Sequence, residues 1–153
     1  MLNEKPWGLI LFKRNIKSFK QLTELIKKIR KFSKDSKFPI IIDEEGKTVS
    51  RLGKIINHTF TQKMFGNMNK YNSKIALLVY KDYINKLSTV FKKVGININT
   101  VPVLDVLREK THKIIADRSF SKDPLIVKKL GKICVEQYKL NKIATVIKHI
   151  PGH

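Results

Sequence analysis

Along its whole length the chain alternates between short, continuous apolar runs and longer stretches in which apolar residues recur at helical spacing. A short continuous apolar run bounded by polar residues is typical of a strand buried on both faces. Such strands are predicted at 8–12, 38–42, 96–104 and 143–147. Helical spacing follows Ser18, extends from Ile75 to Val94, and resumes after Asp123.

Strands that alternate with helices predict a parallel sheet with right-handed crossovers. A doubly wound sheet and a (β/α)8 barrel both fit the order βαβαβαβ. A barrel takes ~250 residues, so four strands in 153 residues would form about half of one. The chain shows no internal repeat, low-complexity tract or linker. We therefore predict one domain or a piece of one.

Local signals mark the ends of the predicted helices. Ser18 is followed three residues later by a glutamine, which is the spacing of a capping box. Gly95 follows the last apolar residue of the second helix and is a typical C-terminal stop. Asp123 offers a capping carboxylate ahead of Pro124 at the first helical position. The polar, glycine-containing stretch between the second strand and Ile75 carries no predicted helix.

The net charge of +20 allows two interpretations. A polyanion partner such as nucleic acid is one, because clustered cations are its electrostatic signature. Compositional drift is the other: 27 of the 32 basic residues are Lys, and Ile and Asn, which share AT-rich codons with Lys, are also abundant. The lysines are spread along the chain, and sequence-reading proteins favour Arg. We therefore favour drift and expect no specific nucleic-acid partner.

Three features of the sequence bear on the cellular compartment: apolar runs, the N-terminal segment and cysteine content. It has no run of 18 apolar residues, so no membrane span is expected. The short apolar run at 7–12 is followed by Lys13 and Arg14 and by no small-residue cleavage site, so we expect no secretory signal. Cys134 is the single cysteine, which fits a reducing compartment. We predict a cytoplasmic protein.

Polar side chains follow every predicted strand, where both candidate folds place their sites. They are Lys13-Arg14-Asn15, Asp43-Glu44-Glu45, Asp105 and Lys148-His149. Arginine is rare in this chain, and its planar fork is irreplaceable where two directed hydrogen bonds are needed. Arg14, Arg51 and Arg118 all lie in segments after strands. These residues predict a polar, hydroxyl-rich or anionic ligand.

Other chemistries are disfavoured. His149 and His153 have the spacing of a zinc pair on a helix, but Pro151-Gly152 between them breaks any helix, so we expect no metal site. The sequence has neither a P-loop nor a GxGxxG motif, and no cofactor is expected. Glu44 and Glu45 are adjacent and should point apart, so they are not interpreted as a catalytic carboxylate pair.

Five segments together resemble a known family. They are GLILFKRN at 8–15, IDEEGKTVSR at 42–51, VPVLDV at 101–106, IADRSF at 115–120 with Asp123-Pro124 beyond it, and KHIPGH at 148–153. In their order and near spacing they resemble the hallmark segments of β-N-acetylglucosaminidases of glycoside hydrolase family 3. The resemblance covers almost the whole chain, and although each segment is weak alone, the set is highly specific.

The resemblance implies a fold and a site. The family's fold is a TIM barrel, so the chain would be an incomplete (β/α)8 barrel of roughly four βα units. The family hydrolyses terminal β-linked N-acetylglucosamine from peptidoglycan-derived muropeptides during cell-wall recycling. By resemblance, the residues that would bind the sugar are Asp43, Arg51, Arg118, Lys148 and His149.

The sequence also departs from the family. Lys47 and Ala116 stand where the family has glycines, and Lys47 would strain the turn if positive φ were needed there. Asn99 and Thr100 replace the usual acidic and aromatic residues. The family's nucleophile and acid/base are expected beyond His153, so residues 1–153 are expected to form a partial catalytic domain, truncated at both ends.

Three interpretations stay open. The chain is expected to be an inactive fragment of the glycosidase, with a separately encoded C-terminal half as its expected partner. The alternatives are a basic binding module and a non-functional remnant of a split gene.

Overall fold

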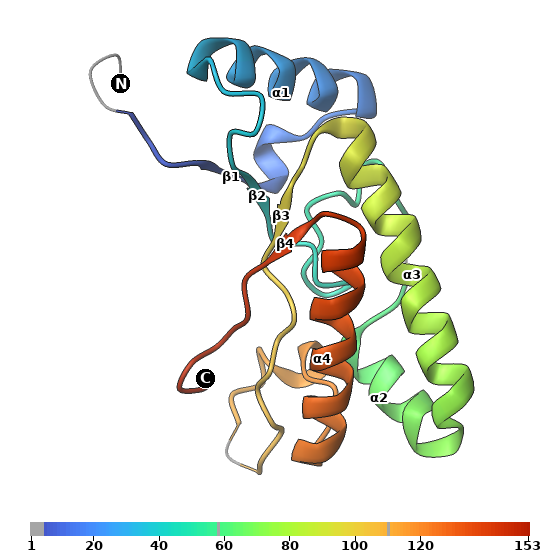
Figure 1. Cartoon of the computed structure of the whole chain (residues 1–153). Helices are drawn as coiled ribbons and strands as arrows, with labels where there is room; N and C mark the ends of the chain where they lie inside the picture. Colours follow the sequence, from blue (N-terminus) through green and yellow to red (C-terminus); the bar gives the residue numbers. More distant parts are fainter. Residues whose placement is uncertain (1–4, 58, 110) are drawn as a thin grey trace.

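The computed structural model describes residues 5–57, 59–109 and 111–153. Four parallel strands form one sheet in the order β1-β2-β3-β4, so each strand pairs with the next one along the chain (Figure 1). They are β1 (Leu9–Leu11), β2 (Ile40–Ile42), β3 (Ile98–Asn99) and β4 (Ala144–Thr145). The predicted α/β class with a parallel sheet is confirmed, and β1 and β4 are its outer strands.

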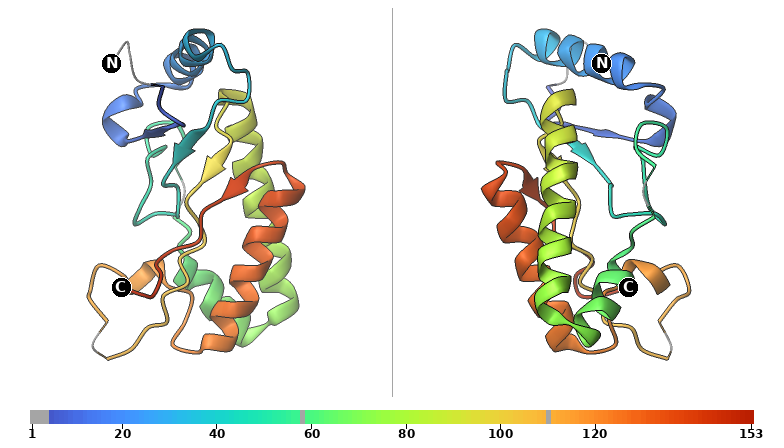
Figure 2. Two further views of the ribbon diagram at one scale, coloured as in Figure 1. Left: turned by 60° about the vertical axis from the view of Figure 1, so that its left-hand side comes forward. Right: turned by 90° about the vertical axis from the view of Figure 1, so that its right-hand side faces the viewer.

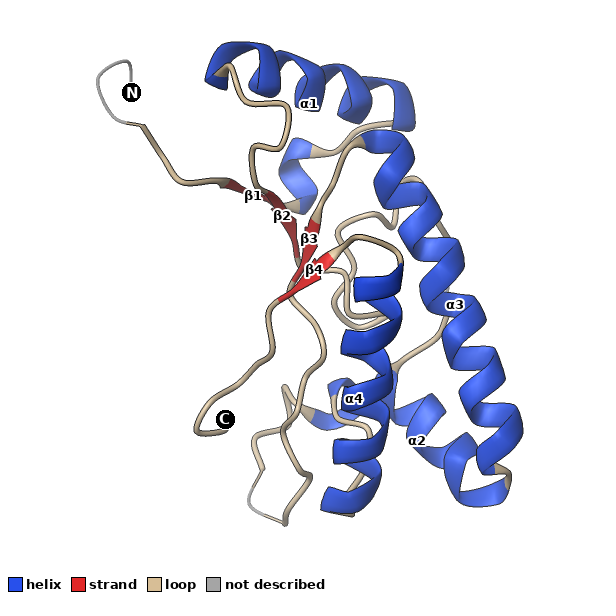
Figure 3. Cartoon of the chain, in the orientation of Figure 1, coloured by secondary structure: helices blue, strands red, loops and turns tan. Residues whose placement is uncertain are grey.

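The strands are shorter than predicted, most of all in the third segment. Only Ile98–Asn99 forms β3, although 96–104 was expected to be extended throughout. Pro102 interrupts the segment because proline has no amide hydrogen to donate to a neighbouring strand. Pairing resumes once, at a parallel bridge between Val103 and Lys148. Long loops follow the short strands β2 and β3 (Figure 3).

Three predicted helices are present and their ends follow the expected signals. They are α1 (Phe19–Ser33), α3 (Ser73–Val94) and α4 (Pro124–Leu140). Ser18 Oγ accepts from the Gln21 amide, but the Gln21 side chain accepts from Lys17 N and not from Ser18 N, so the capping box is incomplete. Gly95 ends α3 at φ 97°, and Asp123 caps α4 through the Leu125 amide.

No helix was predicted between the second strand and Ile75. That prediction was wrong, because α2 (Gln62–Tyr71) lies there. Thr61 caps it by accepting from the Met64 amide. Its buried residues include Phe65 and Gly66, so tertiary contacts stabilise a segment with little apolar periodicity. A Cβ at Gly66 would lie 1.7 Å from the Phe120 carbonyl oxygen, so the glycine permits a close approach of two backbones.

Helices cover one face of the sheet and leave the other open. Figure 2 shows α3 and α4 side by side on one side of the strands. Because paired residues of parallel strands share a face, the register defines two rows. The covered row contains Leu11, Ile42, Asn99 and Thr145. The open row contains Ile10, Ile41, Ile98 and Ala144.

Burial follows this division. Ile42 and Asn99 are both fully buried, and the Asn99 amide donates to the Tyr138 hydroxyl of α4 at 3.2 Å. Ile10 on the open row is 42% exposed. Among the described residues, no helix is long and apolar enough to cross a membrane. The apolar core therefore lies between the sheet and its helices, and the open face carries a second apolar row that is partly exposed.

Candidate functional site

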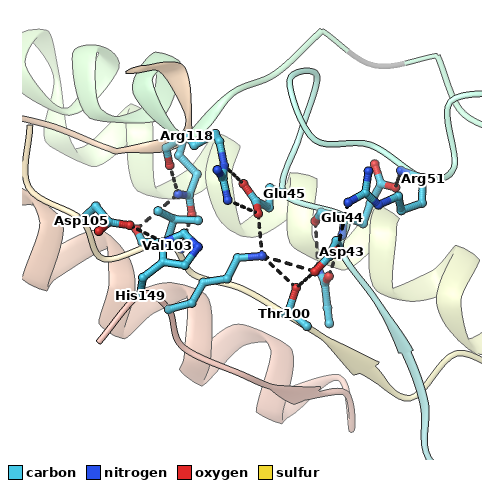
Figure 4. Close-up of polar contacts among 12 residues, drawn as sticks. Asp43, Glu44, Glu45, Arg51, Thr100, Val103, Asp105, Arg118 and His149 are labelled. Atoms are coloured by element: carbon cyan, nitrogen blue, oxygen red, sulfur yellow. Dashed lines mark hydrogen bonds and ion pairs between the residues drawn. The ribbon is translucent and has the colours of Figure 1, made fainter. Parts of the chain in front are cut away.

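A cavity of about 530 Å³ lies at the carboxyl ends of the strands. All five residues that the family resemblance predicted to bind the sugar line it, together with four others outside that set. The full lining is Asp43, Glu45, Thr48, Val49, Arg51, Ile114, Arg118, Lys148 and His149. Side chains from three separate segments of the sequence, 43–51, 114–118 and 148–149, thus converge on one site (Figure 4).

Asp43 follows β2 and is a hub of hydrogen bonds. Its Oδ2 accepts from Arg51 Nη2 at 3.0 Å, and its Oδ1 accepts from Lys148 Nζ at 3.3 Å and from the Thr100 hydroxyl. Burial alone would raise the pKa of Asp43. The hydrogen bonds from Thr100 and Arg51 and the charge of Lys148 outweigh burial and hold the pKa below its ordinary value. Asp43 is therefore an ionised acceptor.

Glu45 forms the second anionic centre. Arg118 binds it through two nitrogens, with Nε–Oε2 at 2.7 Å and Nη2–Oε1 at 3.0 Å. Lys148 Nζ lies 2.6 Å from Glu45 Oε1, so this one ammonium group bridges Glu45 and Asp43. The hydrogen bond to Glu45 raises the pKa of Arg118. The resemblance did not single out Glu45, and only its place one residue beyond Glu44 at a strand end could have indicated it.

The two adjacent glutamates point to different sides, as predicted (Figure 4). Glu44 is 1% exposed, and its Oε2 accepts from the amides of Arg51 and Leu52 at 2.8 Å each. It therefore closes the loop that carries Arg51, whereas Glu45 lines the cavity. Glu44 is a buried loop anchor and is not one half of a carboxylate pair across a ligand.

Two further polar residues that sequence reasoning missed hold the site's loops together. The Gln62 side chain, from the start of α2, donates to the Val103 carbonyl at 3.3 Å and accepts from the Val103 amide at 3.2 Å. Its amide also donates to the Arg118 carbonyl. Thr100, noted only as a departure from the family, donates to Asp43 and accepts from Lys148 Nζ at 3.0 Å. An isolated glutamine in an unpredicted helix gave no signal in the sequence.

The arginines divide by role. Arg51 and Arg118 line the cavity, and Arg14 lies 4.8 Å over the ring of Phe12. Arg30 instead donates to the Gly95 carbonyl at 2.7 Å, on the side of α1 and α3. Scarcity of arginine therefore indicated directed hydrogen bonds at Arg30, Arg51 and Arg118, two of which line the cavity. The same reasoning was wrong for Arg14, which does not line the cavity.

The expected strain at Lys47 does not arise. Among the described residues, positive φ at a non-glycine residue occurs only at Lys34 and Lys142. Positive φ falls instead on Gly46, at 144°, where a Cβ would lie 2.5 Å from the Phe60 carbonyl oxygen. The turn thus requires its first glycine and tolerates lysine after it.

His149 and His153 do not lie on a helix, and their rings meet edge to face with centroids 5.3 Å apart. His149 Nδ1 is 2.6 Å from Asp105 Oδ2. Over residues 5–57, 59–109 and 111–153, no group of three or more His, Cys, Asp or Glu side chains has the arrangement of a metal site.

A family-wide sequence profile described as the glycosyl hydrolase family 3 N terminal domain matches residues 2–153. The β-hexosaminidase of Hydrogenovibrio crunogenus is 34% identical over 146 residues, which cover 95% of this chain and 40% of that protein. β-Hexosaminidase A of Pseudoalteromonas piscicida is 31% identical and matches 95% of this chain and 25% of its own length.

Solved structures agree. Native NagZ from Neisseria gonorrhoeae superposes with a TM-score of 0.87 at 26% identity, over 96% of this chain and 43% of that one. The β-N-acetylglucosaminidase from Thermotoga maritima gives a TM-score of 0.76 at 28% identity, over 97% of this chain and 29% of that one. The chain thus spans less than half the length of each of these relatives. Its fold is the N-terminal part of a NagZ-type (β/α)8 barrel, as the resemblance predicted.

Proposed function

Because the chain belongs to glycosyl hydrolase family 3, whose curated relatives are β-hexosaminidases, we propose that it supplies the sugar-binding half of a β-N-acetylglucosaminidase site. The observation that carries the proposal is the bridge of Lys148 between Asp43 and Glu45, in one cavity with Arg51 and Arg118. The proposed ligand is a terminal β-linked N-acetylglucosamine.

The balance of charge in the cavity favours a neutral, hydroxyl-rich ligand. Asp43 and Glu45 only accept hydrogen bonds, and Arg51, Arg118 and Lys148 only donate them. A sugar hydroxyl does both at once, so it can insert between an anion and a cation and replace part of their contact. The solved complex of Neisseria gonorrhoeae NagZ with N-trifluoroacetyl-D-glucosamine, at a TM-score of 0.87, supports this choice of sugar.

We further propose that the nucleophile and the acid/base lie beyond His153. Hydrolysis with retention needs two carboxyl groups of separate function across the glycosidic bond. Asp43 and Glu45 are each paired with cations, and Glu44 is committed to two backbone amides. The carboxylates that surround the cavity therefore bind and position, and residues 1–153 alone are expected to leave a chromogenic N-acetylglucosaminide uncleaved.

The exposure of the open face supports the proposal that a further segment completes the barrel. Ile10 and Val146 are 42% and 47% exposed, and β1 and β4 end the described sheet. A barrel removes such edges by closing on itself. In the proposed assembly, a C-terminal half in the same or a separately encoded chain covers this face. The proposed substrates are muropeptides in the cytoplasm.

The test is a titration of the isotopically labelled chain with N-acetylglucosamine, followed by NMR, with glucose as the matched sugar that lacks the acetamido group. We expect weak, selective shifts in the segments of Asp43, Arg118 and Lys148. Arg118→Lys removes the two-nitrogen contact with Glu45 and should weaken binding about tenfold. Asp43→Ala should weaken it at least as much.

Arg108→Lys is the matched control, because Arg108 is exposed and lies outside the cavity lining. It makes the same exchange and should leave the affinity unchanged. If neither Asp43→Ala nor Arg118→Lys changes the affinity for N-acetylglucosamine, the proposed site is contradicted. Glucose binding as tightly as N-acetylglucosamine would contradict it as well.

A further inference from the structure

Asp105 lies beside the cavity without lining it. It follows Val103, the residue bridged to Lys148, and its side chain is 3% exposed. Its neighbour His149 does line the cavity. The sequence placed Asp105 at a strand end, and the sugar-binding set described above does not include it.

Both oxygens of the Asp105 carboxylate are occupied. Oδ2 lies 2.6 Å from His149 Nδ1, and Oδ1 accepts from the His153 amide at 2.7 Å. The Asp105 carbonyl accepts from the buried Ser119 hydroxyl, one residue after Arg118. The residue is thus held from two sides, its carbonyl by the loop of Arg118 and its carboxylate by the segment 148–153.

The carboxylate is ionised in this setting. Burial alone would raise the pKa of Asp105, but the hydrogen bonds from His149 and from the His153 amide outweigh it and lower the pKa. An ionised carboxylate accepts hydrogen bonds and cannot donate them. A carboxylate oxygen 2.6 Å from Nδ1 therefore favours the tautomer that carries its proton on Nδ1.

We propose that Asp105 is a positioning residue that holds His149 in the Nδ1–H form and so directs Nε2 of the ring to the ligand. A neutral imidazole has one donor and one acceptor nitrogen, and the bond made by one fixes the role of the other. Among the described residues Nε2 has no hydrogen-bond partner. In the neutral ring, Nε2 accepts from a sugar hydroxyl.

This role differs from that of the other cavity residues. Arg51, Arg118 and Lys148 only donate, and the carboxylates Asp43 and Glu45 already accept from those cations. His149 adds an acceptor that is uncharged and not engaged by a cation. Its direction is set from behind by a buried carboxylate, an arrangement that locks the orientation of a histidine ring.

The experiment reads the tautomer directly, by long-range ¹H–¹⁵N correlation of the imidazole rings in the chain as it exists, at a pH where the ring is neutral. His149→Gln identifies the His149 signals. The expected result is an Nδ1–H ring at His149. In Asp105→Asn the amide can donate to Nδ1, and the ring should change to the Nε2–H form, as an Asp-to-Asn exchange behind a histidine does elsewhere. Asp82→Asn, with the same charge change on the exposed side of α3, should leave the tautomer unchanged.

The readouts separate this inference from the proposed function on which its ligand rests. An Nε2–H ring at His149 in the unchanged chain overturns the inference, and this needs no variant to fold. A tautomer that survives Asp105→Asn, with a native backbone spectrum, overturns it as well. If the tautomer changes and N-acetylglucosamine affinity falls about tenfold, both hold. If the tautomer is as expected and the unchanged chain fails to bind the sugar, the positioning of His149 by Asp105 is upheld and the proposed sugar-binding function is contradicted.

Discussion

The two faces of the sheet both carry large aliphatic side chains, and these are buried to different degrees. On the covered face, Ile42 is fully buried against the helices. On the open face, the neighbouring Ile41 is partly exposed and Val146 is 47% exposed. Apolar burial therefore stabilises one face, and the other presents an apolar surface with little to pack against.

The open face changes character at its carboxyl end. Side chains alternate along a strand, so Asp43 and Lys148 lie on the same side as Ile41 and Val146. There, ion pairs replace apolar contacts, and Lys148 joins two carboxylates. Packing thus stabilises the covered face, and ion pairs stabilise the carboxyl end, or rim, of the open face.

The largest effect is expected from a matched pair in β2. Ile42→Ala removes a fully buried side chain and should lower the free energy of unfolding by about 2–5 kcal/mol. Ile41→Ala, the same exchange one residue earlier, should cost less than about 1 kcal/mol because the side chain is only partly buried. Urea denaturation measures both. Equal costs would mean that the open face is covered in solution.

Next comes the rim. Lys148→Met removes the ammonium between two carboxylates that are 18% and 2% exposed, and should cost about 1–3 kcal/mol, less than a fully buried pair would. Lys86→Met is the control, since Lys86 pairs with Asp82 across an exposed helix turn and should cost about 0.5 kcal/mol or less. Thermal unfolding distinguishes them. If Lys148→Met lowers stability no more than Lys86→Met does, ion pairs do not stabilise the carboxyl end of the open face.

The rim should also respond to acid. The pKa values of Asp43 and Asp105 lie below their ordinary value of 3.8 in the folded chain. Groups of this kind stabilise the fold above their unfolded pKa and lose that contribution as pH falls through the folded one. Their share of stability should be constant from pH 7 to 5 and decline below about pH 4. Asp43→Asn should be less stable at pH 7 and decline less steeply in acid. An unchanged acid slope in that variant would contradict the pairing of Asp43.

Much of the covered face could be predicted, because its signals are local. Buried strands, Ser18, Gly95 and the Asp123-Pro124 start each depend on a few neighbouring residues. The helix α2 could not be predicted, since Gly66 and its polar neighbours are stabilised by a distant backbone segment at Phe120. Packing between remote segments leaves no periodicity in either one.

The site divides in the same way. Strand ends and the family resemblance predicted the residues that face the ligand, such as Asp43 and Lys148. Gln62 was missed, and Glu45 and Asp105 were named only as polar residues at strand ends, without a role. Their partners lie 41, 73 and 44 positions away in the sequence, so no local signal indicates them. Which of two adjacent glutamates faces the cavity depends on the loop at 44–52, which Glu44 itself closes.

The smallest effect on stability should come from Val146→Thr on the open face. Threonine has nearly the shape of valine, and a hydroxyl at a site 47% exposed keeps its contact with water, so stability should change by about 0.5 kcal/mol or less. Self-association should fall, since an exposed apolar face next to an unpaired strand edge favours contact between copies. Val127→Thr is the control on the covered side: Val127 is 3% exposed, and burying its hydroxyl should cost about 1–3 kcal/mol. Sedimentation velocity at several concentrations measures association, and urea denaturation measures stability. If Val146→Thr costs as much as Val127→Thr, the open face is packed in solution and the two faces are held alike.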